Sequence, residues 1–307
     1  YGLSREMETV QEWYNGYLFG SDKTIYNPWS ILKFIKTDDN KPKPYWVNTG
    51  DPELIKRSLQ LNQVQGKKYV EDLYNGKSIE AEVEENIVYE DVFNNVEKAL
   101  SFLLHSGYLK AEYVEGKVNT YNLSIPNREI TQIYRNILKN WFSRDQKSED
   151  LVLSLIQSLL GNDLESFEVY LQDLLIINTS YHDGVKKRER SVKGEEKENQ
   201  ENFYHGLILG LMLHMSDEYY IESNKEYGLG RPDIVILPKD VNKAAFIIEF
   251  KNVYTASKKT TLKAAKEAME QIKEKEYENG VKKTGVSKVI KIGLGFKGKE
   301  VSVKWMC

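Results

Sequence analysis

The sequence predicts an α/β protein in which a C-terminal mixed β-sheet, flanked by helices, is preceded by a mainly α-helical region. Three observations predict this class: helical apolar spacing through much of residues 89–177, a charged run at 184–202, and alternating strand-like and helix-like segments after it. With 307 residues the chain can form more than one core, because single domains usually contain ~100–200 residues. We predict a helical, winged or lid-like region at 1–125, a helical linker with a charged loop at 126–194, and a compact domain at 195–307.

Helix and hairpin signals follow one another in the N-terminal region. Asn27 can cap a helix that has Pro28 in its first turn. Residues 89–109 place apolar side chains on one helical face and end near Gly107, and residues 108–121 have the pattern of a β-hairpin. These signals predict a small helical lobe that closes with a hairpin.

Residues 127–177 have two apolar helical stripes, and the charged run at 184–202 predicts an exposed loop. The compact C-terminal domain follows this loop. Its predicted elements are a helix at 201–215, strands at 219–223, 233–237 and 244–250, a lysine-rich helix at 257–277, and strands at 289–294 and 300–305. This order predicts the mixed sheet.

Composition limits the class of protein. Apolar residues make up 40% and charged residues 29% of the chain, as in ordinary globular proteins. No apolar run approaches the ~20 residues that cross a bilayer, and no signal-peptide pattern is present, so we expect a cytoplasmic protein without membrane contacts. Cys307 is the only cysteine, which excludes disulfides within the chain.

The two halves of the chain differ in charge. Residues 1–180 contain 19 Lys and Arg against 27 Asp and Glu, whereas residues 181–307 contain 24 against 19. A basic surface suits a phosphate-backbone ligand, because lysine and arginine neutralise phosphates and release counterions. A solvated lysine-rich surface explains the same surplus without a ligand, so charge alone leaves both interpretations open.

Three patterns resemble functional motifs but are discounted. The glycines at 293–298 are spaced like a dinucleotide fingerprint, yet a strand-like segment follows where a helix is required, so we predict a hairpin turn. Gly76-Lys77-Ser78 lacks the earlier glycine of a phosphate-binding loop and is predicted to be a surface turn. Tyr181-His182-Asp183 is interpreted as a turn whose aspartate bonds its own backbone.

Charged residues interrupt two apolar strands of the C-terminal domain. Asp233 begins one strand, and Glu249 and Lys251 end the next. A buried charge is costly unless it is paired or binds a metal, so this placement needs a reason. Side chains alternate along a strand, so Glu249 and Lys251 share one face. A neighbouring strand carrying Asp233 would complete a cluster of two carboxylates and one ammonium group.

This cluster suits phosphodiester hydrolysis. Asp233, Glu249 and the backbone carbonyl of Phe250 offer hard oxygen ligands to Mg²⁺ or Mn²⁺, and we expect the two carboxylates to lie close enough to share one ion. Lys251 can orient the attacking water and stabilise developing charge. The structural alternative is that Lys251 simply pairs with Glu249 while Asp233 caps a turn.

The pattern Pro232-Asp233, fifteen residues, then Glu249-Phe250-Lys251 resembles the PD-(D/E)XK nuclease superfamily. The resemblance implies a restriction-endonuclease-like fold, in which the aspartate and glutamate bind the metal and the lysine assists catalysis. It also implies roles for Glu201 on the preceding helix and Gln271 on the following one. Glu201 stands four residues before His205 on one helical face, so a surface pair or a helix N-terminal charge explains it equally well.

A wider resemblance covers nearly the whole chain. It is to a bacterial family that joins an AAA-ATPase-like N-terminal domain to such a nuclease domain (domain of unknown function 1703). The matching segments are Trp13-Tyr14-Asn15-Gly16-Tyr17, Tyr26-Asn27-Pro28-Trp29-Ser30, Tyr45-Trp46-Val47-Asn48-Thr49, Ser106-Gly107-Tyr108-Leu109, Ile125-Pro126-Asn127, Tyr204-His205-Gly206 and Ser223-Asn224-Lys225-Glu226. The P-loop and Walker B strand of that ATPase half are absent, so ATP binding is not predicted, and residues 1–125 would correspond to its lid-like remainder.

The resulting hypothesis is metal-dependent hydrolysis of nucleic acid, with DNA as the favoured substrate. Basic residues beside the site would contact the phosphates: Arg231, Lys258, Lys259, Lys263 and Lys266, with Lys273 and Lys275 farther along the helix. The alternatives are a catalytically silent nucleic-acid-binding or regulatory module of the same fold, and a protein-interacting scaffold. The sequence carries no signal for an oligomeric state.

Overall fold

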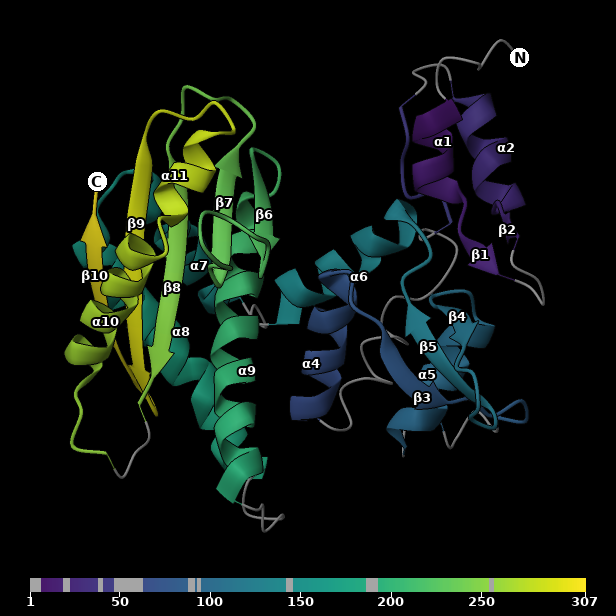
Figure 1. Cartoon of the computed structure of the whole chain (residues 1–307), viewed down its shortest axis with the longest axis horizontal. Coiled ribbons are helices and arrows are strands. Elements are labelled where there is room, and N and C mark those ends of the chain that lie inside the picture. Colours follow the sequence, from purple (N-terminus) through teal and green to yellow (C-terminus); the bar gives the residue numbers. More distant parts are fainter. Residues whose placement is uncertain are drawn as a thin grey trace. The chain divides into compact units, whose positions relative to one another are not determined.

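The computed structural model describes residues 7–18, 23–37, 41–46, 63–87, 92, 95–141, 146–185, 193–253 and 257–307. The chain folds into two compact units, Tyr1–Leu138 and Lys139–Cys307, whose helices and strands are labelled in Figure 1. No helix in these described stretches is long and apolar enough to cross a membrane.

The first unit combines helices with two small antiparallel sheets. Its elements are α1 (Met7–Tyr14), β1 (Tyr17–Leu18), β2 (Thr24–Ile25), α2 (Pro28–Lys36), α4 (Gln63–Tyr74), β3 (Ile79–Glu82), α5 (Val96–His105), β4 (Lys110–Tyr113), β5 (Thr120–Ser124) and most of α6 (Arg128–Trp141). β5 lies between β3 and β4 and is antiparallel to both. The hairpin predicted from the sequence is therefore present as β4 and β5, whereas β3 was not predicted.

Asparagine side chains fix the start of two helices in this unit. Asn27 Oδ1 accepts a hydrogen bond from Trp29 N at 3.0 Å, and Pro28 is the first residue of α2, as predicted. Asn95 Oδ1 accepts from Glu97 N at 2.7 Å, so α5 begins at Val96, later than the predicted helix. Capping chemistry thus locates the helix start more closely than the apolar pattern does.

A buried carboxylate connects three segments of the first unit. Glu129, on α6, is fully buried and accepts hydrogen bonds from Ser30 Oγ and Trp46 N, each at 2.7 Å. Burial raises the pKa of the Glu129 carboxyl, and the two hydrogen bonds act in the opposite direction. The carboxylate is therefore part of the packing between α2, α6 and the loop before Val47.

The second unit contains a five-stranded mixed sheet. Its strands are β6 (Tyr219–Ser223), β7 (Ile234–Pro238), β8 (Ala245–Asn252), β9 (Val289–Lys297) and β10 (Glu300–Met306). They lie in the order β10-β9-β8-β7-β6, with β8 and β9 parallel and the other neighbours antiparallel. The predicted α/β class with a mixed sheet is confirmed.

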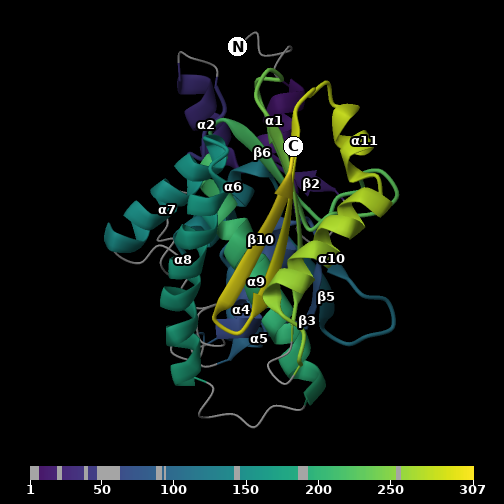
Figure 2. The ribbon, with the colours of Figure 1, turned by 90° about the vertical axis from the view of Figure 1, so that its left-hand side faces the viewer.

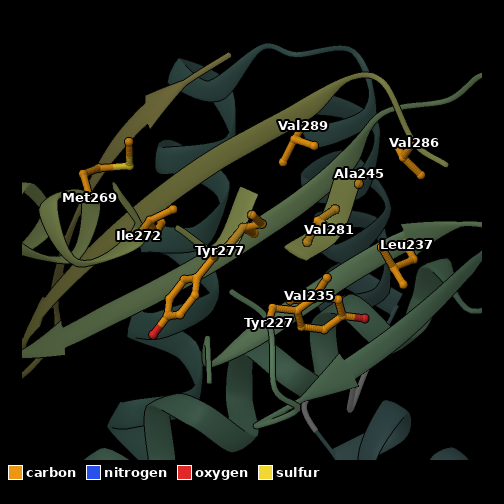
Figure 3. Close-up of a cluster of buried hydrophobic side chains, with 11 residues drawn as sticks. Tyr227, Val235, Leu237, Ala245, Met269, Ile272, Tyr277, Val281, Val286 and Val289 are labelled. Carbon is orange, nitrogen blue, oxygen red and sulfur yellow. The ribbon is translucent and has the colours of Figure 1, made fainter. Parts of the chain in front are cut away.

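Helices cover both faces of this sheet. α10 (Thr261–Glu274) and α11 (Tyr277–Lys282) connect β8 to β9, as a parallel strand pair requires. Figure 2 shows α10 and α11 on one side of the sheet and α7 (Gln146–Leu160) and α8 (Leu164–Val185) on the other. The buried cluster beneath α10 and α11 is drawn in Figure 3 and comprises Tyr227, Val235, Leu237, Ala245, Ile247, Met269, Ile272, Tyr277, Val281, Val286 and Val289.

Helix α9 (Lys193–Met212) packs against the face of the sheet that lies opposite α10. The ring of Tyr204 stacks on Phe296 of β9, with ring centroids 4.4 Å apart. Tyr204 also donates a hydrogen bond from its hydroxyl to the carbonyl oxygen of Gly298 at 2.7 Å. These contacts fix the helix that carries Glu201 and His205.

α10 approaches β9 at backbone distance. A Cβ atom on Gly295 would lie 2.0 Å from the carbonyl oxygen of Thr261, and one on Gly293 would lie 2.4 Å from that of Ala265. The facing side of α10 carries small buried residues, Ala264, Ala265 and Ala268. Glycine on the strand and alanine on the helix together allow this close packing.

The glycine-rich segment at 293–298 is a strand followed by a hairpin turn. Gly298 has a φ of 59° and lies between β9 and β10, which pair antiparallel. The predicted hairpin is present. Gly293 and Gly295, however, lie inside β9 and serve the packing of α10 rather than the turn.

Side chains of α8 cover the outer edge of β10. Val303 N donates to Glu168 Oε2 at 3.1 Å, and Val301 N donates to Gln172 Oε1 at 3.0 Å. The hollow between α8 and β10 is lined by Glu165, Glu168, Val169, Gln172, Asp173 and Val301. Its carboxylates make it unsuited to an anionic ligand.

The helices on either side of the predicted charged loop are longer than predicted. α8 continues to Val185, through the segment 181–183 that was predicted to be a turn, and α9 begins at Lys193 rather than Glu201. Both predictions were wrong. Lysine and glutamate form helices readily, but a stretch without an apolar stripe has no periodicity to reveal the helix. Residues 186–192 of the predicted loop lie outside the described residues.

Candidate active site

Asp233, Glu249 and Lys251 meet where β7 and β8 lie side by side. Asp233 directly precedes β7, and Glu249 and Lys251 lie in the C-terminal half of β8. The two strands are antiparallel, with Ile234 opposite Ile248. The register therefore places Asp233 next to Glu249.

Each carboxylate accepts a backbone hydrogen bond from the other strand. Asp233 Oδ2 accepts from Phe250 N at 2.9 Å, and Glu249 Oε2 accepts from Asp233 N at 3.3 Å. These bonds continue the pairing of the strands beyond Ile234 and Ile248, where the backbone ladder ends. Asp233 thus does not cap a turn of its own, as the structural alternative required.

Gln271 of α10 bridges Glu249 and Lys251. Its Nε2 donates to Glu249 Oε1, and its Oε1 accepts from Lys251 Nζ at 2.5 Å. Lys251 Nζ also lies 3.6 Å from Glu249 Oε1, which is the ion pair of the structural alternative. An ionised carboxylate only accepts and an ammonium group only donates, so the two neighbours fix which way the amide points.

Burial raises the pKa of both carboxyl groups, and the charge of Asp233 raises that of Glu249 further. Glu249 is 2% exposed, and burial followed by the charge of Asp233 raises its pKa to about 8. Burial also raises the pKa of Asp233, against the effects of the Phe250 N–H and the charges of His205 and Lys251. Two carboxylates that resist being charged together form a site that a cation would stabilise.

The donors present fit a divalent ion held by two carboxylates and a backbone oxygen. In the part of the chain that the structure describes, no three His, Cys, Asp or Glu side chains form a group that could hold a metal ion. The ligands would therefore be Asp233, Glu249 and the carbonyl of Phe250, supplemented by water, which are the hard oxygens that Mg²⁺ prefers. The N–H of Phe250 is directed at Asp233. Because the N–H and C=O of one strand residue point to the same side, we expect its carbonyl on that side too.

α9 brings His205 and Glu201 to the same end of the sheet. His205 Nε2 lies 2.9 Å from Ser223 Oγ and 3.4 Å from the carbonyl oxygen of Asp233, with its ring against Phe250. Glu201 is exposed one turn earlier on α9, and its charge contributes to raising the pKa of Asp233. Its predicted catalytic role stays a prediction, because it forms no three-side-chain metal group with the two carboxylates.

The predicted phosphate-contacting residues lie before β7 and around the first half of α10. Arg231 pairs with Glu226 at 2.7 Å, and Lys259 pairs with Glu267. These two cations are thus partly neutralised within the chain. Arg231 is exposed despite its ion pair, and Lys258, Lys263 and Lys266 are exposed as well.

Tyr277 is a neighbour of the site that the sequence interpretation missed. Its hydroxyl lies 3.4 Å from Gln271 Nε2. Six residues separate the two, which does not place them on one helical face. The structure brings them together because the predicted single helix is broken at Glu276, whose φ is 51°.

A comparison with known proteins assigns the C-terminal region to a superfamily. Residues 199–306 match the family model of the PD-(D/E)XK nuclease superfamily, and this range includes Asp233, Glu249, Lys251 and Gln271. The match does not reach the N-terminal segments, so their resemblance to an ATPase-like module stays a prediction. No curated protein matches the chain. The superfamily suggests nuclease-type phosphodiester hydrolysis and generally uses divalent metals such as Mg²⁺. The resemblance to the PD-(D/E)XK nuclease superfamily is therefore confirmed for the C-terminal region, residues 199–306.

Proposed function

We propose that the C-terminal unit is a divalent-metal-dependent nuclease, with DNA as the favoured substrate and Asp233, Glu249 and Lys251 as its catalytic residues. One observation carries the proposal. Two carboxylates, each accepting a hydrogen bond from the backbone of the other's strand, lie beside an ammonium group in the region that matches the nuclease superfamily. A like-charge pair in which Glu249 is buried is unfavourable without a cation, so binding a metal ion would stabilise it.

The residues have separate roles in this proposal. Asp233, Glu249 and the Phe250 carbonyl would hold the ion, which when bound supplies a Lewis acid for the phosphate and lowers the pKa of a water molecule. Lys251 has 36% of its side chain exposed, so its ammonium group can reach a phosphate oxygen or the attacking water. Gln271 holds Lys251 through its amide oxygen at 2.5 Å. A water molecule attacks phosphorus and gives up a proton to solvent, while the bond from phosphorus to the leaving oxygen breaks and that oxygen takes up a proton. The Lys251 charge stabilises the negative charge that develops on the phosphate.

Metal removal is the first test of this function. The purified 307-residue chain should cut plasmid or single-stranded DNA in the presence of Mg²⁺ or Mn²⁺, lose the activity in EDTA, and regain it when the metal is returned in excess. RNA of the same sequence serves as the competing substrate. A parent protein that cuts neither DNA nor RNA with either metal would favour the catalytically silent module.

The exposed lysines of α10 provide the second test. Lys266 and Lys263 lie ~7 and ~12 Å from Gln271 along the helix axis, close enough for phosphates flanking the scissile bond. The Lys263→Gln/Lys266→Gln double variant should bind DNA more weakly and reduce the slope of log K against log salt by about 2. Lys147, exposed on α7 across the sheet, is the control, and Lys147→Gln should leave the slope unchanged. Equal slopes in all three proteins would assign the α10 lysines to solvation alone.

A further inference from the structure

The amide of Gln271 has three polar neighbours, of which the sequence pattern accounts for two. Its Oε1 accepts from Lys251 Nζ, and one hydrogen of Nε2 is donated to Glu249 Oε1. An amide nitrogen carries two hydrogens. The hydroxyl of Tyr277, 3.4 Å from Nε2, is the acceptor for the second.

Tyr277 is buried in the position from which it contacts Gln271. The side chain is 1% exposed and belongs to the buried cluster of Figure 3. A Cβ atom on Gly230 would lie 3.4 Å from both Cε1 and the hydroxyl of Tyr277, so the hydroxyl also borders the turn that leads into Asp233. The ring and the hydroxyl are thus enclosed by neighbouring atoms of the protein.

The hydroxyl is neutral and sits within the field of the carboxylate pair. Burial raises the pKa of Tyr277, and the charges of Glu249 and Asp233 act in the same direction. A neutral phenol can accept the amide hydrogen of Gln271 without adding a third negative charge. This is the property that a contact beside these two carboxylates requires.

We propose that Tyr277 is a positioning residue for the nuclease reaction: its hydroxyl fixes the amide of Gln271, which in turn holds Lys251 beside Glu249. The inference rests on the proposed function and deepens it by one residue. Without the hydroxyl, one partly buried N–H of Gln271 lacks its acceptor. The amide then turns more freely, and Lys251 loses the fixed oxygen that directs its ammonium group.

The chain offers a matched control for this role. Tyr227 belongs to the same buried cluster and is 8% exposed, but its hydroxyl donates to Glu222 instead. In Figure 3 the hydroxyls of Tyr277 and Tyr227 point in opposite directions. Tyr277→Phe and Tyr227→Phe therefore remove the same atom from the same core, and only the first removes a contact to Gln271.

Kinetics separate positioning from packing. Tyr277→Phe should lower kcat about 10-fold with KM for DNA unchanged, the size of effect typical of second-layer contacts to a catalytic group, while Tyr227→Phe should keep the parent kcat. In a Gln271→Ala background, Tyr277→Phe should have no further effect on kcat, because the two residues act in series. A loss of kcat that is equal in both phenylalanine variants, or that is additive with Gln271→Ala, would overturn the inference.

A measurement without turnover keeps the inference distinct from the proposed function. The side-chain amide signals of Gln271, assigned by their loss in Gln271→Ala, should shift and lose protection from hydrogen exchange in Tyr277→Phe but not in Tyr227→Phe. Unchanged amide signals in Tyr277→Phe would overturn the positioning role even in an active nuclease. If the parent protein is inactive, the proposed nuclease function is wrong. The amide signals alone would then show whether the Tyr277 hydroxyl holds the Gln271 amide.

Discussion

Asp233→Asn is expected to abolish DNA cleavage and to leave the protein folded. The substitution removes the charge that would bind the metal but keeps an oxygen that can accept from Phe250 N, as Asp233 Oδ2 does at 2.9 Å. We expect kcat/KM to fall by about 10³-fold or more, because the loss affects the group on which transition-state stabilisation depends. Cleavage assays in Mg²⁺ and Mn²⁺, with circular dichroism of the same samples, measure both outcomes.

The same variant is expected to be more stable than the parent when no metal is present. The pKa of Glu249 in the folded protein, about 8, lies above its ordinary value of 4.5, so the folded state binds more protons between these values. Stability of the metal-free parent therefore falls as pH rises through that window. Asp233→Asn removes the second cause of the shift, so its Tm should exceed that of the parent at about pH 8 and match it near pH 4.

Two comparisons give this prediction its controls. Asp240, exposed at the far end of β7, accepts from Asn242 N at 3.0 Å, and Asp240→Asn should keep full activity. Glu249→Gln is the less clean variant, because both oxygens of Glu249 accept hydrogen bonds and an amide can replace only one. If Asp233→Asn instead loses about 3–5 kcal/mol, as when a buried ion pair is broken, the carboxylates serve the structure rather than catalysis.

Gly295→Ala is expected to be the most destabilising single change beside the site. The added Cβ would lie 2.0 Å from the carbonyl oxygen of Thr261 and 2.7 Å from Ala265 N, so α10 must move away from β9. We expect a loss of about 3 kcal/mol in the free energy of unfolding, at the upper end of overpacking effects. Gly295 is paired with Lys251 across β8 and β9, so the displaced helix also carries Gln271 away from Lys251.

Gly298→Ala in the adjoining turn is the control for this prediction. Its φ of 59° makes alanine strained, but nothing lies within 4 Å of the added Cβ. It should lose only about 1 kcal/mol and keep the kcat of the parent. Chemical denaturation of both variants measures the difference, and equal losses would show that backbone strain, not the approach of α10, dominates.

The sequence predicted the parts of the site that depend on local periodicity. Alternation along β8 placed Glu249 and Lys251 on one face, and the strand order brought Asp233 beside them. Gln271 came from the family resemblance, and the structure places it against Lys251. Only the alternation along β8 is a pattern within one segment, which a sequence displays directly.

Tertiary packing determined what the sequence could not predict. Tyr277 enters the site because Glu276 adopts a left-handed conformation, which a non-glycine residue gives no reason to expect. β3 alternates apolar and charged residues over only four positions, and its pairing with β5 spans some forty residues. The glycines of β9 resembled a turn in the sequence, because their role is to let α10 pack closely and α10 lies in a different segment of the chain.

The hydrogen bonds between α8 and β10 also limit how two copies of this protein can associate. An outer strand with unused N–H groups can recruit a strand from another molecule and extend the sheet. Here Glu168 and Gln172 occupy the outward N–H groups of Val303 and Val301. Joining two sheets through β10 would first require α8 to release both bonds and to leave a carboxylate facing the incoming backbone. This edge therefore resists strand exchange and fibrillar self-association.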